Sequence, residues 1–407
     1  MDRIKQEKLA KLRKAWAELF VPDIMAFPIK GLRIGTMWWG AEKIIRSVFE
    51  NRFTAVKSGH SMSKDWAAGI ITLMWLTKYI PSKIILTAPT GRQVDHIMFG
   101  EIEKQFRALQ KFTPFVFMDD CLKTCMLELA SDWFALGFTT KDTKDKTGKF
   151  QGFKSPNMLI IVSEAQAVED SVYDQIDGLM TSGNSRLLEI GNPIIPEGRF
   201  WEHCTQEKYG YNVIKLSCFD SPNYAARKEI IPGMATYEFV EHMRKVWGEQ
   251  HPYWYGKILG EFPQNVSDAI IPIAWIMRAI NREIPDNDDL RVGGLDVSKG
   301  GTDETVHALL YGRVCQPMIG FHNVDINETV GWAKSLVKEE KLEAYGVDEG
   351  GLAGIAGFLE EDDIPVVRIM FGAAVEESED FDNLAAYMWW LLRDAFQNNE
   401  ISIPDDH

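Results

Sequence analysis

The sequence contains little cysteine, which limits the ways in which the chain can be cross-linked or bind zinc. Five cysteines are spread over 407 residues, namely Cys121, Cys125, Cys204, Cys218 and Cys315. One pair, Cys121 and Cys125, has the i,i+4 spacing of a helix, but no second pair with the spacing of a zinc site follows it. We therefore expect reduced thiols in the protein core rather than a disulfide framework or a zinc centre.

Long apolar runs are also missing. No stretch reaches the roughly 18 apolar residues that a membrane-spanning helix needs. The N-terminal segment, MDRIKQEKLAKLRKAW, has a charged, helical pattern and lacks the apolar core of a signal peptide. We expect no membrane contact and a protein that stays in the cytoplasm of the cell that makes it. A chain of 407 residues exceeds the usual size of one compact domain, so we expect two domains.

The sequence contains fewer basic residues than acidic ones. The chain has 44 Lys and Arg against 59 Asp and Glu, and its net charge of −15 limits nonspecific binding to nucleic acid. Much of the acidic excess lies in residues 359–407, whereas residues 141–154, KDTKDKTGKFQGFK, are locally basic. The composition is therefore compatible with a local DNA contact. An ordinary solvated loop is the alternative for the basic segment.

Short apolar segments alternate with helical patterns through the first half of the chain. They predict buried strands of a parallel sheet at residues 53–56, 83–88, 158–162, 186–191 and 213–217. Residues 221–263 differ in character, because turn signals are followed by a helical stretch. The second half predicts a β-hairpin, a further buried strand and a long helix, at residues 291–298 with 305–313, 344–348 and 383–396. The predicted fold class is α/β.

Residues 58–65, SGHSMSKD, lie between a predicted strand and a predicted helix, where a nucleotide-phosphate loop is built. Such a loop surrounds phosphate oxygens with backbone N–H groups and adds a lysine for the phosphates and a hydroxyl for Mg²⁺. Lys64 holds the lysine position, Ser58 and Ser63 replace the two glycines, and Asp65 replaces the hydroxyl residue. A non-glycine residue at positive φ costs on the order of 1–3 kcal/mol, which can loosen the loop without destroying it. The motif alone is equally compatible with a chance match. The other candidate phosphate-binding residues of the loop are Gly59, His60, Ser61 and Met62.

A second segment, MLIIVSEAQAV at residues 158–168, is an apolar strand followed by Ser163 and Glu164. In phosphate-loop ATPases the corresponding strand ends in Asp-Glu, of which the Asp supports Mg²⁺ and the Glu activates water. Glu164 is present here, but Ser163 takes the aspartate position. We hypothesise an exchange in which Asp65 supplies the carboxylate and Ser163 the hydroxyl for one Mg²⁺. The alternative is that both positions have lost their role and ATP is not hydrolysed.

Further polar side chains follow other predicted strands. Asn192, in the segment EIGNP, is a candidate sensor of the terminal phosphate, although the tripeptide alone also fits an ordinary turn. Asp296 and Asp348 each end a strand of the second half, and Asp303 lies in a glycine-rich turn that can bring it beside Asp296. Such carboxylates can hold a pair of hard cations on a phosphodiester. Ordinary turn carboxylates are the alternative.

Taken in this order, the segments resemble the large terminase subunit of tailed bacteriophages. The resemblance covers nearly the whole chain and includes WWGAEKIIRSVFENRFTAVKSGH, TAPTGRQVDHIMFGEI, LIIVSEA, GNP, SCFDSPN, ILGEFP, GLDVSKGGTDET, GVDEGGLAGIAGFL and NLAAYMWWLLRDAFQNNEISIPDD. It implies a phosphate-loop ATPase domain of the RecA-like ASCE type in residues 1–220, with an N-terminal helical arm. It further implies a linker subdomain in residues 221–265 and a ribonuclease H-like nuclease domain in residues 266–407.

The resemblance also implies viral DNA packaging, in which ATP drives double-stranded DNA into a procapsid and concatemeric DNA is cut. The implied cofactors are ATP with Mg²⁺, and two Mg²⁺ or Mn²⁺ ions for the nuclease. The implied partners are double-stranded DNA, the capsid portal protein, the small terminase subunit and further copies of the chain in a ring, the isolated chain being a monomer. The place of action is the cytoplasm of the infected bacterium, with transient attachment to the procapsid. Two alternatives are a DNA- and portal-binding assembly component without ATP hydrolysis, and a stand-alone metal-dependent nuclease of the resolvase type.

By the same resemblance, Lys64 contacts phosphate, Glu164 is the catalytic carboxylate and Asn192 the coupling residue. Asp296 and Asp348 become metal ligands of the nuclease, and Asp303 an auxiliary acid.

Several positions depart from the pattern of the family. Glu42 stands where a glutamine typically reads adenine, and a carboxylate cannot donate to the base. Lys146 or Lys149 would have to replace an arginine finger, with Arg92 as an outside candidate, and lysine lacks the guanidinium fork. The third nuclease carboxylate of the family follows the SIPDD strand, so a chain ending at His407 is expected to have a truncated nuclease domain.

Overall fold

In the computed structural model the chain forms two compact units, Met1–Gln264 and Asn265–His407. The structure describes residues 14–35, 37–111, 118–140, 152–264, 269–285, 290–298, 304–322, 325–349, 354–362, 364–375 and 381–405. Residues 221–264, which the sequence assigns to a linker subdomain, group with the first unit. The three-part functional division of the chain stays a prediction.

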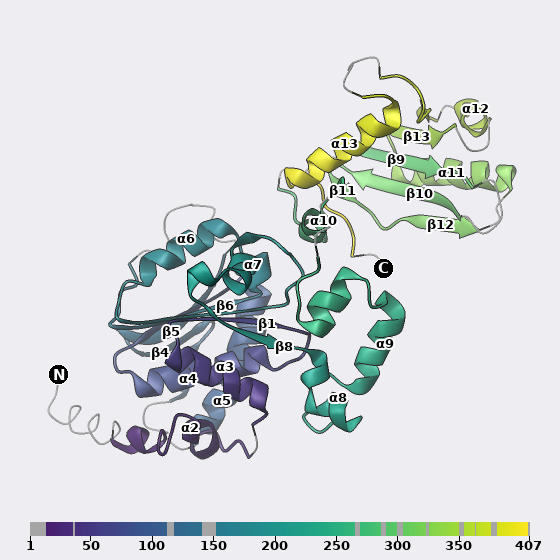
Figure 1. Ribbon diagram of the computed structural model, residues 1–407. Helices are drawn as coiled ribbons and strands as arrows, with labels where there is room; N and C mark the ends of the chain where they lie inside the picture. Colours follow the sequence, from purple (N-terminus) through teal and green to yellow (C-terminus); the bar gives the residue numbers. More distant parts are fainter. Residues whose placement is uncertain are drawn as a thin grey trace. The chain divides into compact units, whose positions relative to one another are not determined.

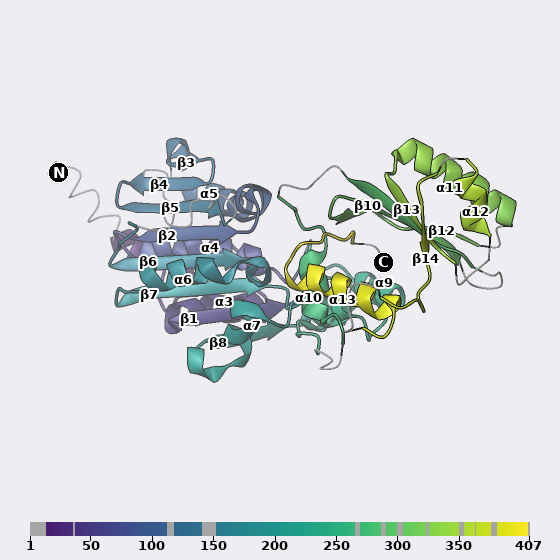
Figure 2. The same cartoon turned by 90° about the horizontal axis from the view of Figure 1, so that it is seen from above.

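The first unit contains an eight-stranded sheet (Figure 2). Its strands are β1 (Phe53–Ser58), β2 (Lys83–Ala88), β3 (Leu122–Lys123), β4 (Met126–Ala130), β5 (Trp133–Thr139), β6 (Asn157–Ser163), β7 (Asn184–Gly191) and β8 (Asn212–Leu216). They lie in the order β3-β4-β5-β2-β6-β7-β1-β8. The six strands from β5 to β8 in this order run parallel. The predicted parallel sheet is confirmed, and all five strands expected in this half are present.

The edge formed by β3, β4 and β5 is not predicted by the sequence pattern. β3 and β4 pair antiparallel, and β4 pairs antiparallel with β5. Cys121 ends a 3-10 turn and Cys125 lies between β3 and β4 at φ 52°, so their spacing is not helical. The five cysteines form no disulfide with one another, as expected. Cys218 is buried, and Cys121, Cys125 and Cys204 are partly buried and pack against the two cores, so the expectation of core thiols fails for Cys315.

Helices cover both faces of this sheet (Figure 1). α3 (Trp39–Glu50), α4 (Lys64–Lys78) and α5 (Gly100–Gln110) lie on one face, and α6 (Asp170–Leu179) and α7 (Gly198–Thr205) on the other. Since successive side chains of a strand point to opposite faces, β6 sends Leu159 and Ile161 into one core and Ile160 and Val162 into the other. The remaining helical segments of this unit are α2 (Ala26–Lys30), α8 (Pro222–Ala226), α9 (Tyr237–Trp247), the π-helical η1 (Gln93–Phe99) and η6 (Trp254–Leu259), and the 3-10 turns η2 (Asp119–Cys121), η3 (Ala165–Ala167), η4 (Glu207–Tyr209) and η5 (Cys218–Asp220).

The second unit has a mixed sheet of its own. Its strands are β9 (Arg291–Asp296), β10 (Glu304–Tyr311), β11 (Val314–Cys315), β12 (Ile319–His322), β13 (Ala344–Asp348) and β14 (Val366–Ile369). β9 and β10 pair antiparallel, which confirms the predicted hairpin, whereas β9, β13 and β14 run parallel. The α/β fold is thereby confirmed in both units.

The helices of the second unit are α10 (Ile273–Ala279), α11 (Ile326–Glu340), α12 (Ile355–Glu360) and α13 (Leu384–Gln397). α11 and α12 contribute to one core with β9, β10 and β13. α13 confirms the predicted long helix, and it packs against α10. Within the described parts of both units, no helix has the length and apolar character needed to cross a membrane.

Candidate functional site

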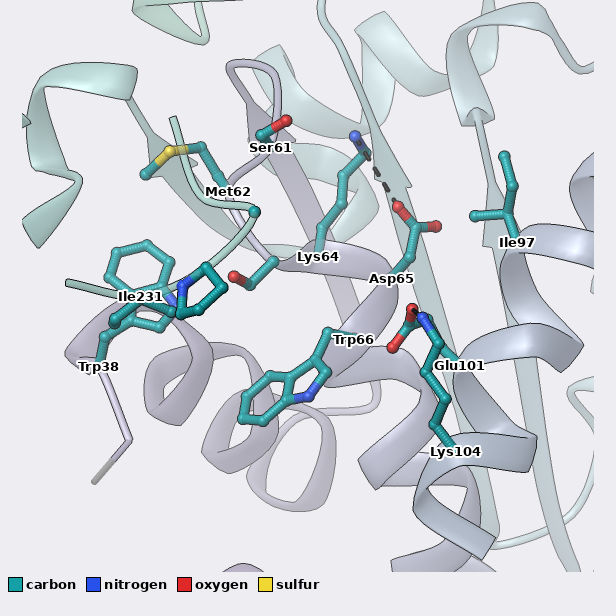
Figure 3. A pocket seen from close by; sticks show the side chains of 13 residues that line it. Trp38, Ser61, Met62, Lys64, Asp65, Trp66, Ile97, Glu101, Lys104 and Ile231 are labelled. Carbon is teal, nitrogen blue, oxygen red and sulfur yellow. Dashed lines mark hydrogen bonds and ion pairs between the residues drawn. The ribbon is translucent and has the colours of Figure 1, made fainter. Parts of the chain in front are cut away.

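A pocket of about 570 Å³ opens where the 58–65 loop enters α4 (Figure 3). Its walls also include Trp38 directly before α3, parts of η1 and α5, and residues 231–233. Its lining residues are Trp38, Ser61, Met62, Ser63, Lys64, Asp65, Trp66, Ile97, Glu101, Lys104, Ile231, Pro232 and Gly233. The N-terminus of a helix favours anions, because its first backbone N–H groups point outward and its dipole is positive there. The pocket is therefore placed to accept an anionic group.

Two serines give the loop its left-handed turns. Ser61 has φ 53° and Ser63 has φ 61° with ψ 22°, and Ser63 is the residue directly before α4. Ser58 lies at the buried end of β1 and is not among the residues with positive φ. A Cβ added to Gly59 would lie 2.6 Å from Cys218 Sγ, so this position needs glycine for space. The loop thus keeps a left-handed turn at Ser63, where the standard motif uses glycine, and a second one at Ser61.

Neighbouring segments hold the first half of the loop. Gly59 N–H donates to Leu216 O at 2.8 Å, and His60 N–H donates to Lys257 O at 2.7 Å. Burial of the imidazole, together with the charges of Lys64 and Lys257, lowers the pKa of His60 to about 4. His60 is therefore neutral at pH 7.

Asp65 and Ser163 are in direct contact. Ser163 Oγ, at the end of β6, donates a hydrogen bond of 2.9 Å to Asp65 Oδ1. Asp65 Oδ2 lies 4.0 Å from Nζ of Lys64, whose side chain is 7% exposed (Figure 3). Carboxylate and hydroxyl oxygens are ligands that suit Mg²⁺. The structure thus brings together the two positions at which the sequence departs from the standard ATPase pattern.

Glu164 and Asn192 follow the adjacent strands β6 and β7. Glu164 has φ 52° and ψ 46°, and Gln166 Nε2 donates to its Oε2 at 2.7 Å. Asn192 is buried, and its Nδ2 donates to Ser58 O at 2.6 Å, which ties the end of β7 to the start of the loop. The sequence reasoning did not select Gln166, whose only local signal is its place two residues after Glu164.

Glu42 and Arg92 are not among the residues that line the pocket. Glu42 is in the first turn of α3, where its carboxylate accepts from Arg46 Nε at 2.7 Å, and it is not a lining residue of the pocket. Arg92 is exposed at the start of η1. Lys146 and Lys149 lie outside the described residues.

Two carboxylates end neighbouring strands of the second unit. Leu295 of β9 pairs with Val347 of β13 in parallel register, and the next residue on each strand is Asp296 and Asp348 respectively. Their side chains therefore share one edge and one face of the sheet. Asp303 lies outside the described residues, among which no group of three or more His, Cys, Asp or Glu side chains is arranged to hold a metal ion.

A comparison with curated proteins finds a relative among phage proteins. Over 260 residues the chain is 24% identical to a protein of Enterobacteria phage P7 described as a probable terminase, large subunit. This chain resembles large terminase subunits. The resemblance predicted from the order of the sequence segments is thereby confirmed. The match covers 61% of this chain and 50% of the P7 protein, so the chain spans about half the length of that terminase relative, and no family model matches.

Solved terminase structures are also similar to this chain. The large terminase of bacteriophage HK97 is 13% identical, with 94% of this chain and 89% of that chain covered and a TM-score of 0.46. The large terminase of a thermophilic bacteriophage is 12% identical, with 91% and 88% covered and a TM-score of 0.45. The ATPase domain of the large terminase of Thermus phage P74-26 is 15% identical, with 57% and 96% covered and a TM-score of 0.42.

Proposed function

We propose that the chain acts as the large subunit of a viral DNA-packaging terminase, with an ATPase site in the first unit and a DNA endonuclease site in the second. The observation that carries the proposal is the contact between Asp65 and Ser163 beside the buried Lys64, at the N-terminus of α4. A chance match to a phosphate loop gives no reason for the strand-end serine to meet the residue that follows the lysine.

Each residue of the cluster has a defined part in this proposal. Lys64 and the backbone N–H groups at the start of α4 bind the phosphates. Asp65 and Ser163 fit Mg²⁺ as hard oxygen ligands, and the ion would supply charge neutralisation on the phosphates. Glu164 orients and activates the attacking water, and Asn192 couples the loop to the end of β7 through Ser58 O.

The endonuclease proposal rests on Asp296 and Asp348. Two carboxylates at one edge of the sheet fit the binding of Mg²⁺ or Mn²⁺, which would stabilise charge on the phosphodiester. The proposed partners are double-stranded DNA, the capsid portal protein, the small terminase subunit and further copies of the chain in a ring. The site of action is the host cytoplasm, with transient attachment to the procapsid. Because the net charge is −15, the isolated chain should bind DNA weakly and with a strong dependence on salt.

The test is phosphate release from ATP and Mg²⁺ by the full chain, with and without double-stranded DNA. Lys64→Ala should abolish turnover by weakening ATP binding. Glu164→Gln should keep ATP binding and lower turnover by about 10²–10⁴-fold, because only water activation is lost. Matched controls are Lys43→Ala on α3 and Glu169→Gln directly before α6, both exposed side chains outside the pocket.

A plasmid-cleavage assay with Mn²⁺ tests the second unit in parallel, with Asp296→Asn and Asp348→Asn expected to stop cutting. Turnover that survives both Lys64→Ala and Glu164→Gln would contradict the proposed ATPase site. Metal-dependent cutting without any ATP turnover, with or without DNA, would favour a stand-alone nuclease instead.

A further inference from the structure

We propose that Gln166 is a positioning residue that holds the Glu164 carboxylate for water activation, in a space that Gly191 leaves open. The inference rests on the proposed ATPase function and adds two residues to its site. It starts from the hydrogen bond of 2.7 Å that Gln166 Nε2 donates to Glu164 Oε2.

The backbone of Glu164 is fixed by a hydrogen bond, whereas its side chain needs a separate contact to hold it. Glu164 stands in the left-handed region, at φ 52° and ψ 46°, directly before the short 3-10 turn η3. Its carbonyl accepts from Ala167 N–H at 2.9 Å, which fixes the backbone but leaves the side chain to rotate about its own bonds. The Gln166 amide removes that freedom, because it holds one carboxylate oxygen and leaves the other to a water. Pre-orientation of a catalytic group in this way raises kcat, because the group is already ordered before the reaction begins.

The other end of the Gln166 amide lies against the end of β7. A Cβ built on Gly191 would stand 2.3 Å from Gln166 Oε1, closer than any real side chain tolerates. Ser163 of β6 pairs with Ile190 of β7 in parallel register, so Gly191 is the β7 residue next to Glu164. Glycine at this position is therefore what lets the amide lie between the two strand ends.

The Gln166 amide lies between two strand ends of the proposed site. Gln166 Oε1 is buried and has no hydrogen-bond partner among the described residues. One of the two strand ends carries Glu164, which accepts from Gln166. The other carries Asn192, one residue after Gly191, and Asn192 donates to Ser58 O of the loop. Gln166 thus links the proposed catalytic carboxylate to the strand end that touches the phosphate loop.

The first experiment measures kcat for phosphate release together with ATP affinity by calorimetry on the full chain. Gln166→Leu and Gln166→Met remove the amide and keep similar bulk, so kcat should fall by about 10–100-fold, as for other groups that orient a reacting side chain. ATP affinity and melting temperature should stay unchanged. Gln175→Leu on α6 is the matched control, because Gln175 also has a buried, unpartnered amide oxygen but bonds only to Ser171 O within its own helix.

Two further variants give readouts that a merely structural role would not move. Gln166→Glu places a second carboxylate within hydrogen-bond distance of Glu164, and two such carboxylates share a proton, so the acid limb of the pH–rate profile should move to higher pH. Gly191→Ala should lower kcat by displacing the amide. The double variant Gly191→Ala with Gln166→Ala should be only slightly slower than Gln166→Ala alone, because the nearest clashing group has been removed and the next contacts are Ala165 N at 3.2 Å and Phe200 Cε1 at 3.3 Å.

The outcomes separate the inference from the proposed function. Wild-type turnover that is lost in Glu164→Gln but retained in both Gln166→Leu and Gln166→Met would overturn the inference and leave the ATPase proposal standing. Loss of ATP affinity or of melting temperature in step with kcat would also overturn it, since Gln166 would then be structural. A wild-type chain that never releases phosphate, even with DNA, would remove both.

Discussion

Ser61 and Ser63 show how single residues can keep a phosphate loop in shape without its usual glycines. Both have positive φ, at 53° and 61°, and a non-glycine residue in this region costs roughly 1–2 kcal/mol. Of the two serines at glycine positions, Ser63 carries this strain, whereas Ser58 does not because it belongs to β1. The expected cost of serine for glycine therefore falls on Ser63, directly before α4.

The exchange of Asp65 and Ser163 gives the sharpest prediction at this scale. Asp65→Ser should leave two hydroxyls in contact. Ser163→Asp should leave two adjacent carboxylates that repel each other. Either single variant should therefore weaken Mg²⁺-dependent ADP binding and slow phosphate release. The double variant restores one carboxylate and one hydroxyl in contact, and the coupling energy between the two sites should be about 1–3 kcal/mol. Calorimetry of ADP binding with Mg²⁺ and with EDTA measures it. A double variant no better than the weaker single one would refute the exchange.

At the scale of elements, a buried polar cluster joins α7 and the start of β8 to β7. Glu189 of β7 is fully buried, and its Oε1 accepts from Tyr211 OH at 2.6 Å and lies 2.9 Å from His203 Nδ1 of α7. The rings of His203 and Tyr211 stack with centroids 4.3 Å apart. Burial, and then the nearby Glu189 carboxylate, raise the pKa of Tyr211 far above its ordinary value, so the phenol stays protonated as a donor. β7 leads directly to Gly191 and Asn192, which makes this cluster a support of the proposed site.

We predict that breaking this cluster lowers the stability of the first unit. His203→Leu should lower the free energy of unfolding by about 3–5 kcal/mol, because it leaves the Glu189 carboxylate buried without that partner. The pair Glu189→Leu with His203→Leu should cost less than the sum of the two single changes. Urea denaturation followed by tryptophan fluorescence measures both. His242→Leu on α9, an exposed histidine, is the control, and an equal loss there would show that the cluster carries no special stability.

At the scale of the whole molecule, each unit has its own sheet and its own core, and each holds a histidine with a lowered pKa. In the second unit His307 is fully buried in β10 beside Trp332 of α11, with Nδ1 3.0 Å from Tyr345 OH. Burial lowers the pKa of His307 to about 4, against an opposing effect of Glu340. Between pH 6.5 and about 4 the unfolded chain takes up a proton here that the folded unit does not, so stability falls as the pH falls through this window.

Calorimetry of the full chain should therefore show a transition of the second unit that moves to lower temperature between pH 7 and about pH 4.5. His307→Phe keeps an aromatic ring and removes the titrating group, so the same transition should depend less on pH. His242→Phe in the first unit should leave it unchanged. An equal pH dependence in wild type and His307→Phe would mean that other groups cause the acid sensitivity.

Part of this molecule can be predicted from local patterns along the chain. Apolar runs such as KIILTA locate β2 without error, and the strand-end residues Asp296 and Asp348 are found because parallel strands carry their polar residues at one edge. Lys64, the first residue of α4, is found from the phosphate-loop motif. β3, β4 and β5 are missed: β3 has only two residues, and the MLELA sequence of β4 is rich in residues that also favour a helix. Glu42 is better explained by a signal that the sequence also contains, the i,i+4 pair with Arg46.

The sequence by itself determined the α/β alternation, the place of the loop and the residue types available at each strand end. Only the tertiary structure decided which of them meet. Asp65 and Ser163 are 98 positions apart, and their contact depends on the strand order that places β6 near the start of α4. Gln166 meets Glu164 through their spacing of two residues, but its place against Gly191 depends on the parallel register of β6 and β7. Local patterns specify local conformation, whereas contacts between strand ends depend on order and register, which arise when the whole sheet packs.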